Sequence, residues 1–208
     1  MIAIIDYGAG NLRSVSKALK KIGADAIITS DPKSIDSSTA MVLPGVGSFG
    51  AAISNLKEMG LDKAIRENVA KGKPLLGICL GMQLLFDRSF EDGIWEGLGL
   101  IGGNVIRFSD LSLKVPHMGW NQLIPNRDDE IGLGIAMGEY AYFVHSYYAM
   151  PDKTEDVVFY TEYGVQVPAV VRRNSVIGMQ FHPEKSGDTG MKLLENFVEL
   201  IKKMEKNL

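Results

Sequence analysis

Cys79 is the only cysteine in this chain of 208 residues, and it lies at the centre of the segment 77–81, Gly-Ile-Cys-Leu-Gly. An apolar run precedes this segment, and a helical pattern beginning at Met82 follows it. A side chain on a sharp strand-to-helix turn projects from the backbone, and the crowded flanking positions must be small, as both glycines are. The start of the helix favours an anion. The pattern therefore predicts a nucleophilic thiolate; the alternative is a buried structural cysteine.

His182 is the best candidate for the base that such a thiol needs. It follows the strand-like segment 176–181 in the sequence His-Pro-Glu, where the proline ends the strand and sets the backbone direction. Glu184 lies two residues further on and could orient the imidazole. Nucleophile, base and carboxylate together make a catalytic triad. The alternative is a histidine at a strand end, beside a solvated glutamate.

A glycine-rich loop, Pro-Gly-Val-Gly-Ser-Phe-Gly at positions 44–50, follows the apolar run 40–43. Acyl transfer through a tetrahedral intermediate requires backbone N–H groups directed at the developing oxyanion. The loop around Gly45 and Val46 could supply one such donor, and the N–H of Leu80 could supply another. By itself the loop is a weak signal, because many strand-to-helix turns contain glycine.

These three segments, in this order, resemble the three signatures of class I (triad) glutamine amidotransferases. The segments 6–11, 116–121 and 142–147 further resemble the glutaminase subunits of imidazole glycerol phosphate synthases, a branch of that family. The resemblance implies a flavodoxin-like α/β fold, hydrolysis of L-glutamine through a thioester, and no cofactor. It also implies a set of glutamine contacts made by Gly47, Gln83, Glu91, Ser146 and Tyr147. Relatives often have threonine where this chain has Ser146, which keeps the hydroxyl.

The same resemblance implies a partner. Relatives dock on a separate (β/α)₈ cyclase barrel, and ammonia passes through that barrel to a phosphorylated ribotide of the histidine pathway. They also couple glutaminase activity to occupancy of the barrel. This chain contains no barrel of its own, so the partner must be another polypeptide. The resemblance assigns to the interface the residues Asn11, Trp120, Tyr142 and Lys185. A paralogous glutaminase that serves another synthase, such as one aminating a surface sugar, and a catalytically silent binding subunit remain as alternatives.

Composition excludes several other classes of function. The net charge of −3 predicts neither a nucleic acid nor an anionic membrane as partner, and no apolar run approaches the roughly 18 residues of a membrane span. A single cysteine cannot form an internal disulfide, which favours the cytoplasm. The three histidines are too dispersed in the sequence for a metal site. The glycines after the first strand do not form a dinucleotide fingerprint, because Arg13 occupies the third glycine position.

The apolar pattern predicts one domain, 1–208, of the α/β class. In the first half, strand candidates at 2–5, 26–29, 40–43 and 75–79 alternate with helical segments, one of them interrupted near Gly60. This pattern is typical of a parallel sheet covered on both faces, with the site at the carboxyl ends of its strands. In the second half, short segments at 103–108, 141–149, 156–161, 166–171 and 176–181 predict an antiparallel portion. The last helix should pack on the core, and the acidic run 128–130 should be a solvated loop.

Overall fold

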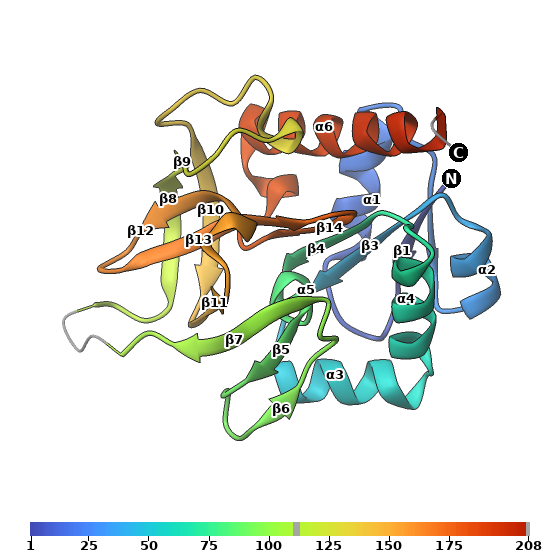
Figure 1. Ribbon diagram of the computed structural model, residues 1–208, viewed down its shortest axis with the longest axis horizontal. Coiled ribbons are helices and arrows are strands. Elements are labelled where there is room, and N and C mark those ends of the chain that lie inside the picture. The colour runs from blue at the N-terminus through green and yellow to red at the C-terminus, as the bar shows by residue number, and fades with distance from the viewer. Residues whose placement is uncertain (110–112, 207–208) are drawn as a thin grey trace.

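The computed structural model describes residues 1–109 and 113–206, which are built around an eight-stranded sheet (Figure 1). From one edge to the other the strands are β2 (Ala26–Thr29), β1 (Ile2–Ile5), β3 (Ala40–Gly45), β4 (Leu75–Cys79), β14 (Val176–Met179), β13 (Gln166–Arg173), β12 (Val157–Glu162) and β9 (Ile124–Pro125). Neighbours from β2 to β14 are parallel, and those from β14 to β9 are antiparallel. The predicted α/β class is therefore confirmed, with a mixed central sheet.

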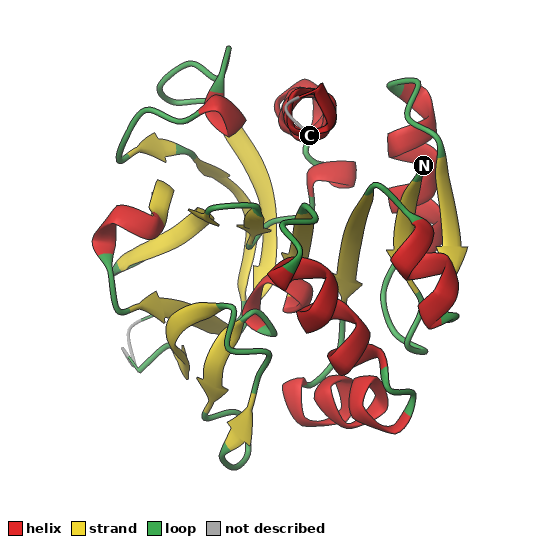
Figure 2. Cartoon of the chain, turned by 45° about the vertical axis from the view of Figure 1, so that its right-hand side comes forward, coloured by secondary structure: helices red, strands yellow, loops and turns green. Residues whose placement is uncertain are grey.

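Helices cover both faces of the parallel strands, because these strands are apolar on both faces. Ile2 and Ile4 pack toward α1 (Leu12–Lys21) and α6 (Gly187–Lys206). Ala3 and Ile5 pack toward α2 (Pro32–Ser37), α3 (Phe49–Glu58) and α4 (Leu61–Ala70) on the opposite side. In Figure 2 these helices gather around one half of the molecule, and the other half consists mainly of strands. The last helix packs on the core, as predicted.

The break predicted near Gly60 is confirmed. Gly60 separates α3 from α4 and has a φ of 67°, in the left-handed region that glycine enters without a steric penalty. Its backbone N–H donates to the carbonyl of Lys57 and so closes the end of α3. Among the described residues, no helix has the length and apolar character needed to cross a membrane.

Besides β9, β12 and β13 of the large sheet, the chain between β4 and β14 forms two smaller sheets. One contains β11 (Tyr147–Pro151), β7 (Ile101–Arg107), β5 (Phe86–Ser89) and β6 (Trp95–Glu96), and the other pairs β10 (Tyr140–His145) with β8 (His117–Gln122). Three short 3-10 helices complete the described elements: η1 (Glu130–Gly132), η2 (Thr154–Asp156) and η3 (Pro183–Lys185). The prediction of one strand over 141–149 is wrong. The chain leaves one sheet after His145 and enters another at Tyr147, so that Ser146 lies at a break.

The helix expected after Cys79 is also much shorter than the pattern indicated. It is the single turn α5 (Leu80–Gln83), after which β5 begins at Phe86. The carbonyls of Leu84 and Leu85 accept hydrogen bonds from the N–H groups of Leu98 and Leu100 instead of continuing a helix. Burial of both leucines in a tertiary contact therefore overrides their helical propensity.

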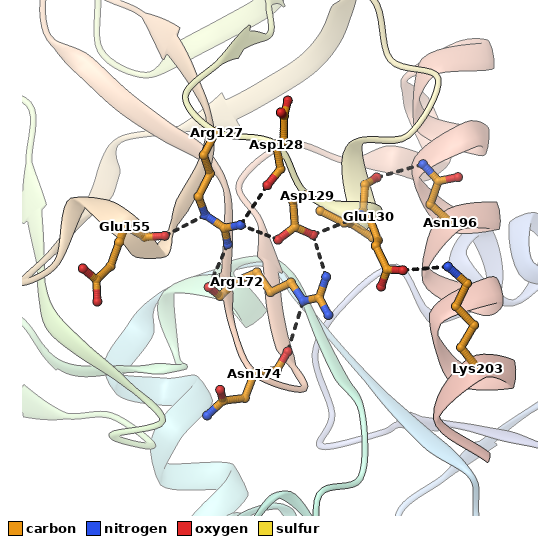
Figure 3. Close-up of polar contacts among 10 residues, drawn as sticks. Arg127, Asp128, Asp129, Glu130, Glu155, Arg172, Asn174, Asn196 and Lys203 are labelled. Atoms are coloured by element: carbon orange, nitrogen blue, oxygen red, sulfur yellow. Dashed lines mark hydrogen bonds and ion pairs between the residues drawn. The ribbon is translucent and has the colours of Figure 1, made fainter. Parts of the chain in front are cut away.

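The acidic run 128–130 is not a uniformly solvated loop, and the prediction is wrong for Asp129. Its side chain is only 6% exposed and lies between two arginines, with Oδ2 2.6 Å from Nη1 of Arg127 and Oδ1 2.6 Å from Nη1 of Arg172 (Figure 3). Its Oδ1 also accepts the N–H of Ile131 and so caps η1. These contacts tie the loop to β13, and they hold the pKa of Asp129 below its ordinary value in spite of its burial.

We expect Asp129→Asn to lower the free energy of unfolding by roughly 2–3 kcal/mol, because it leaves two half-buried guanidinium groups without a counter-charge. Denaturant-induced unfolding measures this loss. The matched control is Asp128→Asn at the exposed neighbouring position, which should change stability by less than about 0.5 kcal/mol. Equal stabilities for the two variants would contradict the structural role given to Asp129.

Candidate active site

A cavity of about 410 Å³ opens at the carboxyl ends of β3 and β4, where the predicted site lies. Of the residues singled out in the sequence, those lining it are Val46, Gly47, Cys79, Leu80, Gln83, Glu91, Ser146, Tyr147, His182 and Lys185. Glu184 lies directly behind His182, and Gly45 lies beside Cys79 in the register of β3 and β4. Asn11, Trp120 and Tyr142 do not line the cavity.

Cys79 occupies the strand-to-helix turn with a φ of 55° and a ψ of −112°, a conformation that costs a non-glycine residue about 1–3 kcal/mol. Close packing around the turn holds it there. A Cβ on Gly77 would lie 2.6 Å from the carbonyl oxygen of Gly81, and one on Gly81 would lie 1.8 Å from that of Leu43. Both flanking glycines are therefore required, for the steric reason expected from the sequence.

His182 and Glu184 form a buried pair beside the cavity. Nδ1 of His182 lies 3.0 Å from Oε1 of Glu184, and the two side chains are 4% and 1% exposed. The hydroxyl of Ser186 donates to the His182 carbonyl, and the N–H of His182 donates to the Tyr142 carbonyl, so the backbone is anchored on both sides. Burial lowers the pKa of His182, but the sulfur of Cys79 and the carboxylate of Glu184 outweigh it and raise the pKa to about 9. The imidazole is thus poised to be a cation beside the sulfur of Cys79.

The glycine-rich loop is positioned by Tyr7, which the sequence reasoning missed. The Tyr7 hydroxyl is buried and donates to the carbonyl of Pro44 at 2.9 Å, which fixes the direction of that carbonyl. Burial, and then the nearby Cys79, raise the pKa of Tyr7, so the hydroxyl keeps its proton and remains a donor. A Cβ on Gly45 would lie 2.7 Å from this hydroxyl and 2.7 Å from the N–H nitrogen of Gly81. The loop therefore packs directly against the turn that carries Cys79.

The side chains proposed to contact glutamine differ in how many of their polar atoms already form hydrogen bonds within the protein. Nε2 of Gln83 donates to the Tyr147 carbonyl at 2.8 Å and to Oε1 of Gln180 at 3.0 Å, so only its Oε1 is left for a ligand. Oε2 of Glu91 accepts the N–H of Phe49 at the start of α3, and burial raises the pKa of this carboxyl. Glu91 thus lines the cavity and caps a helix at once.

A buried pair of histidines lies against the cavity wall and was also missed. Nδ1 of His145 contacts the Tyr147 carbonyl at 2.8 Å and must carry a proton, because a carbonyl only accepts. Its Nε2 therefore accepts from Nδ1 of His117 at 3.0 Å, and Nε2 of His117 accepts from Asn121 at 3.2 Å. Burial lowers the pKa of His117 to about 4 and that of His145 to about 3. The three histidines, dispersed in sequence, thus meet near one site; within the described ranges no cluster of ligands suits a metal ion.

Of the residues assigned to a partner interface, Lys185 lines the cavity, and Asn11, Trp120 and Tyr142 lie outside it. Trp120 of β8 is 55% exposed and faces Tyr142 of β10, its register partner, with ring centroids 6.0 Å apart. Lys185 lies in η3, directly after the His182–Glu184 pair. These positions give one exposed aromatic ring, that of Trp120, beside the half-buried Tyr142, and a cation, Lys185, in the cavity wall.

Comparison with known proteins places these features in a family. A model of the class-I glutamine amidotransferases matches residues 3–201. The chain is 53% identical over 202 residues to the imidazole glycerol phosphate synthase subunit HisH of Caldanaerobacter subterraneus subsp. tengcongensis, covering 97% of this chain and 99% of that protein. It is 52% identical over 202 residues to the HisH subunit of Methanothermobacter thermautotrophicus, covering 97% and 100%.

Solved structures share the fold at lower sequence identity. A crystal structure of a glutamine amidotransferase superposes with a TM-score of 0.77 at 21% identity, covering 97% of this chain and 100% of that one. A chain of PurLQS from Thermotoga maritima superposes with a TM-score of 0.74 at 22% identity, covering 96% and 98%. Both likenesses concern the arrangement of helices and strands.

Because His117 and His145 are buried as neutral side chains, we expect the free energy of unfolding to fall on acidification. The folded protein keeps both pKa values below the ordinary 6.5, so the unfolded chain takes up protons first as the pH falls. The contribution of this pair to stability should be full above about pH 6.5 and be lost as the pH falls toward the folded-state pKa values of about 4 and 3, with a slope approaching 1.4 kcal/mol per pH unit for each histidine. His182 acts in the opposite sense, because its pKa is raised to about 9: its contribution is full well below pH 6.5 and is lost as the pH rises toward 9.

Denaturant unfolding at several pH values measures this slope. In His117→Phe one of the two titrating groups is gone, and an aromatic ring remains to stack on Phe143 and Tyr163. The variant should therefore show a shallower decline over the same window. A slope identical to that of the wild-type protein would contradict the assignment of His117 as a buried neutral histidine.

Proposed function

The chain belongs to the class I glutamine amidotransferase family, and we propose that it is the glutaminase subunit of an imidazole glycerol phosphate synthase in histidine biosynthesis. The observation that carries the proposal is the meeting of Cys79, at a strained turn, with the buried pair of His182 and Glu184 at one cavity. The relatives compared above are subunits of that synthase and align over nearly their whole length. We infer that residues 1–208 form one domain.

In the first half of the proposed reaction, the Cys79 thiolate attacks the side-chain amide carbon of glutamine. The electrons of the carbonyl move to its oxygen, which accepts hydrogen bonds from the N–H of Leu80 and from the loop at Gly45 and Val46. When the tetrahedral intermediate collapses, the C–N bond breaks and His182 gives its proton to the departing amine. The products of this half are ammonia and a glutamyl thioester on Cys79.

In the second half, His182 is neutral and accepts a proton from water as the water oxygen attacks the thioester. The C–S bond then breaks, glutamate leaves, and the thiolate and the imidazolium are restored together. Glu184 keeps His182 in one orientation through both halves, since its Oε1 holds the proton-bearing Nδ1. The raised pKa of His182, about 9, suits a group that must be a cation at the start of each turnover.

The rest of the cavity would hold the amino-acid end of glutamine. We assign this contact set to Gly47, Gln83, Glu91, Ser146 and Tyr147, which all line the cavity. The free Oε1 of Gln83 can only accept, so it must meet an N–H group of the substrate. Glu91 offers a negative charge to the α-ammonium.

The ammonia must reach an acceptor before it becomes ammonium, and we propose a separate (β/α)₈ cyclase subunit as the partner. The docking surface would be formed by Asn11, Trp120, Tyr142 and Lys185, at the edge of the cavity. Exposed aromatic residues often carry a large share of interface energy, which fits Trp120. The proposal places the pair in the cytoplasm, where a lone thiol stays reduced.

Removal of the nucleophile tests the chemistry. We expect Cys79→Ala, assayed with the cyclase barrel, to lose glutamine-dependent synthesis by a factor of about 10⁴ or more. Synthesis from added ammonium salts should be unchanged, because the barrel keeps its own active site. Unchanged use of glutamine by Cys79→Ala would refute the proposal and favour a silent binding subunit.

The identity of the partner is tested by glutamate release from the wild-type chain, first alone and then with the barrel and its ribotide ligand. Strong stimulation by the liganded barrel is the expected result. Glutamate release that ignores the barrel would keep the glutaminase chemistry but assign the chain to another synthase.

A further inference from the structure

The proposed reaction uses Cys79 as a thiolate, and this anion requires a source of stabilisation other than the helix that follows it. That helix, α5, is a single turn of four residues, so few peptide dipoles add up at its start. Among the described residues, the sulfur contacts the Val144 carbonyl oxygen, at 3.8 Å, and Nε2 of Gln180, at 3.9 Å, and it also interacts with the imidazole of His182. The carbonyl can accept from a thiol but repels a thiolate. Besides His182, Gln180 is thus the side chain placed to donate to the anion.

Gln180 is held rigidly and has no contact with solvent. It is 0% exposed, directly follows β14, and donates its backbone N–H to the Ala169 carbonyl of β13 at 2.9 Å. Its side-chain oxygen accepts from Nε2 of Gln83 at 3.0 Å, while its nitrogen points to the sulfur of Cys79. A fully buried amide whose donor faces a nucleophile has a function to be explained, because a hydrophobic residue would fill the same space.

The direction of this amide is set by a backbone carbonyl two contacts away. Nε2 of Gln83 also donates to the Tyr147 carbonyl at 2.8 Å. If the Gln83 amide were reversed, its oxygen would face that carbonyl oxygen without a proton between them. Gln83 therefore presents N–H to Gln180. Gln180 must accept this hydrogen bond with its oxygen, and its own N–H groups then face Cys79. Gln83 thus donates on both sides, to the Tyr147 carbonyl and to Gln180, and Gln180 donates to the sulfur.

We propose that Gln180 stabilises the Cys79 thiolate as an N–H donor, and that Gln83 and the Tyr147 carbonyl lock the Gln180 amide in the donating orientation. The proposal deepens the proposed function and rests on it for its role in turnover. In acylation the sulfur loses its negative charge to the new C–S bond, and the contact with Gln180 weakens. In deacylation the charge returns to the sulfur, so the same N–H assists its departure from the thioester.

His182 and Gln180 also stabilise the sulfur at different stages of the reaction cycle. His182 stabilises the thiolate as a cation, but it loses its proton to ammonia in the middle of each turnover. Gln180 carries no ionisable group, so its N–H stays in place throughout the cycle. The second half of the reaction therefore still has a donor at the sulfur while His182 is neutral.

The rate of alkylation by iodoacetamide as a function of pH tests the proposal on the full chain. Cys79 is the only cysteine, so the reagent reports this thiol alone, and no glutaminase activity is needed. We expect Gln180→Met, which keeps the length but removes the donor, to raise the pH midpoint of alkylation by about one unit. Below the midpoint the variant should react about tenfold more slowly than wild type at the same pH. Gln180→Glu, which places a carboxylate at the sulfur, should shift the midpoint at least as far.

The matched control is Asn196→Asp in α6. Asn196 is another buried amide whose nitrogen donates to two carbonyls, those of Ile131 and Leu133. Its conversion should lower the melting temperature but leave the alkylation midpoint unchanged, which separates loss of stability from loss of the donor. If Gln180→Met does not fold, Gln83→Met serves instead, because it frees the Gln180 amide to reverse and should shift the midpoint in the same direction by a smaller amount.

An unchanged midpoint in folded Gln180→Met, or in Gln83→Met where that variant replaces it, would overturn the proposal. The proposed function fails independently. If wild-type protein released no glutamate with the liganded barrel while the midpoint still shifted, the thiolate contact would stand and the glutaminase assignment would fall. Normal glutamate release with an unshifted midpoint would give the reverse result.

Discussion

The left-handed backbone of Cys79 is the constraint on which the site depends. A side chain at φ 55° and ψ −112° is held there because β3, β4 and α5 approach one another where no Cβ fits, at Gly45, Gly77 and Gly81. The parallel register that pairs Gly45 with Cys79 brings the glycine-rich loop beside the nucleophile. A local strain of about 1–3 kcal/mol is thus imposed by packing of the whole sheet. The same packing sets the sulfur and the candidate oxyanion donors in one place.

The Tyr147 carbonyl is the second organising feature. It accepts hydrogen bonds from side chains because the chain breaks between β10 and β11. Had residues 141–149 formed one continuous strand, this carbonyl would be available for a regular ladder. At the break it accepts from Nε2 of Gln83 and from Nδ1 of His145. One acceptor thereby sets the direction of the amide chain to Cys79 and the tautomers of the buried histidine pair. The polarity of one wall of the cavity follows from a backbone group, which substitution of side chains cannot alter directly.

Much of this arrangement could be predicted from the sequence, because it follows from local rules. Apolar strands alternating with amphipathic helices indicated the parallel half, and small residues around Cys79 indicated the sharp turn. The predictions that failed did so because of contacts between segments that are far apart in the sequence. The helix after Cys79 stops because the carbonyls of residues 84 and 85 bond to a distant loop, and Asp129 is buried because two arginines reach it from separate segments. Tyr7 and Gln180 had no signal of their own, since their roles depend on contacts with residues far along the chain.

A crystal structure of the chain after reaction with an electrophilic glutamine analogue tests the account most directly. We predict one covalent bond, to the sulfur of Cys79, with Cys79 still at positive φ and the amino-acid end of the adduct between Gln83, Glu91 and Tyr147. Attachment to another residue would contradict the assignment of the nucleophile. Attachment to Cys79 with the backbone relaxed to negative φ would contradict the claim that the strained turn positions the reacting sulfur.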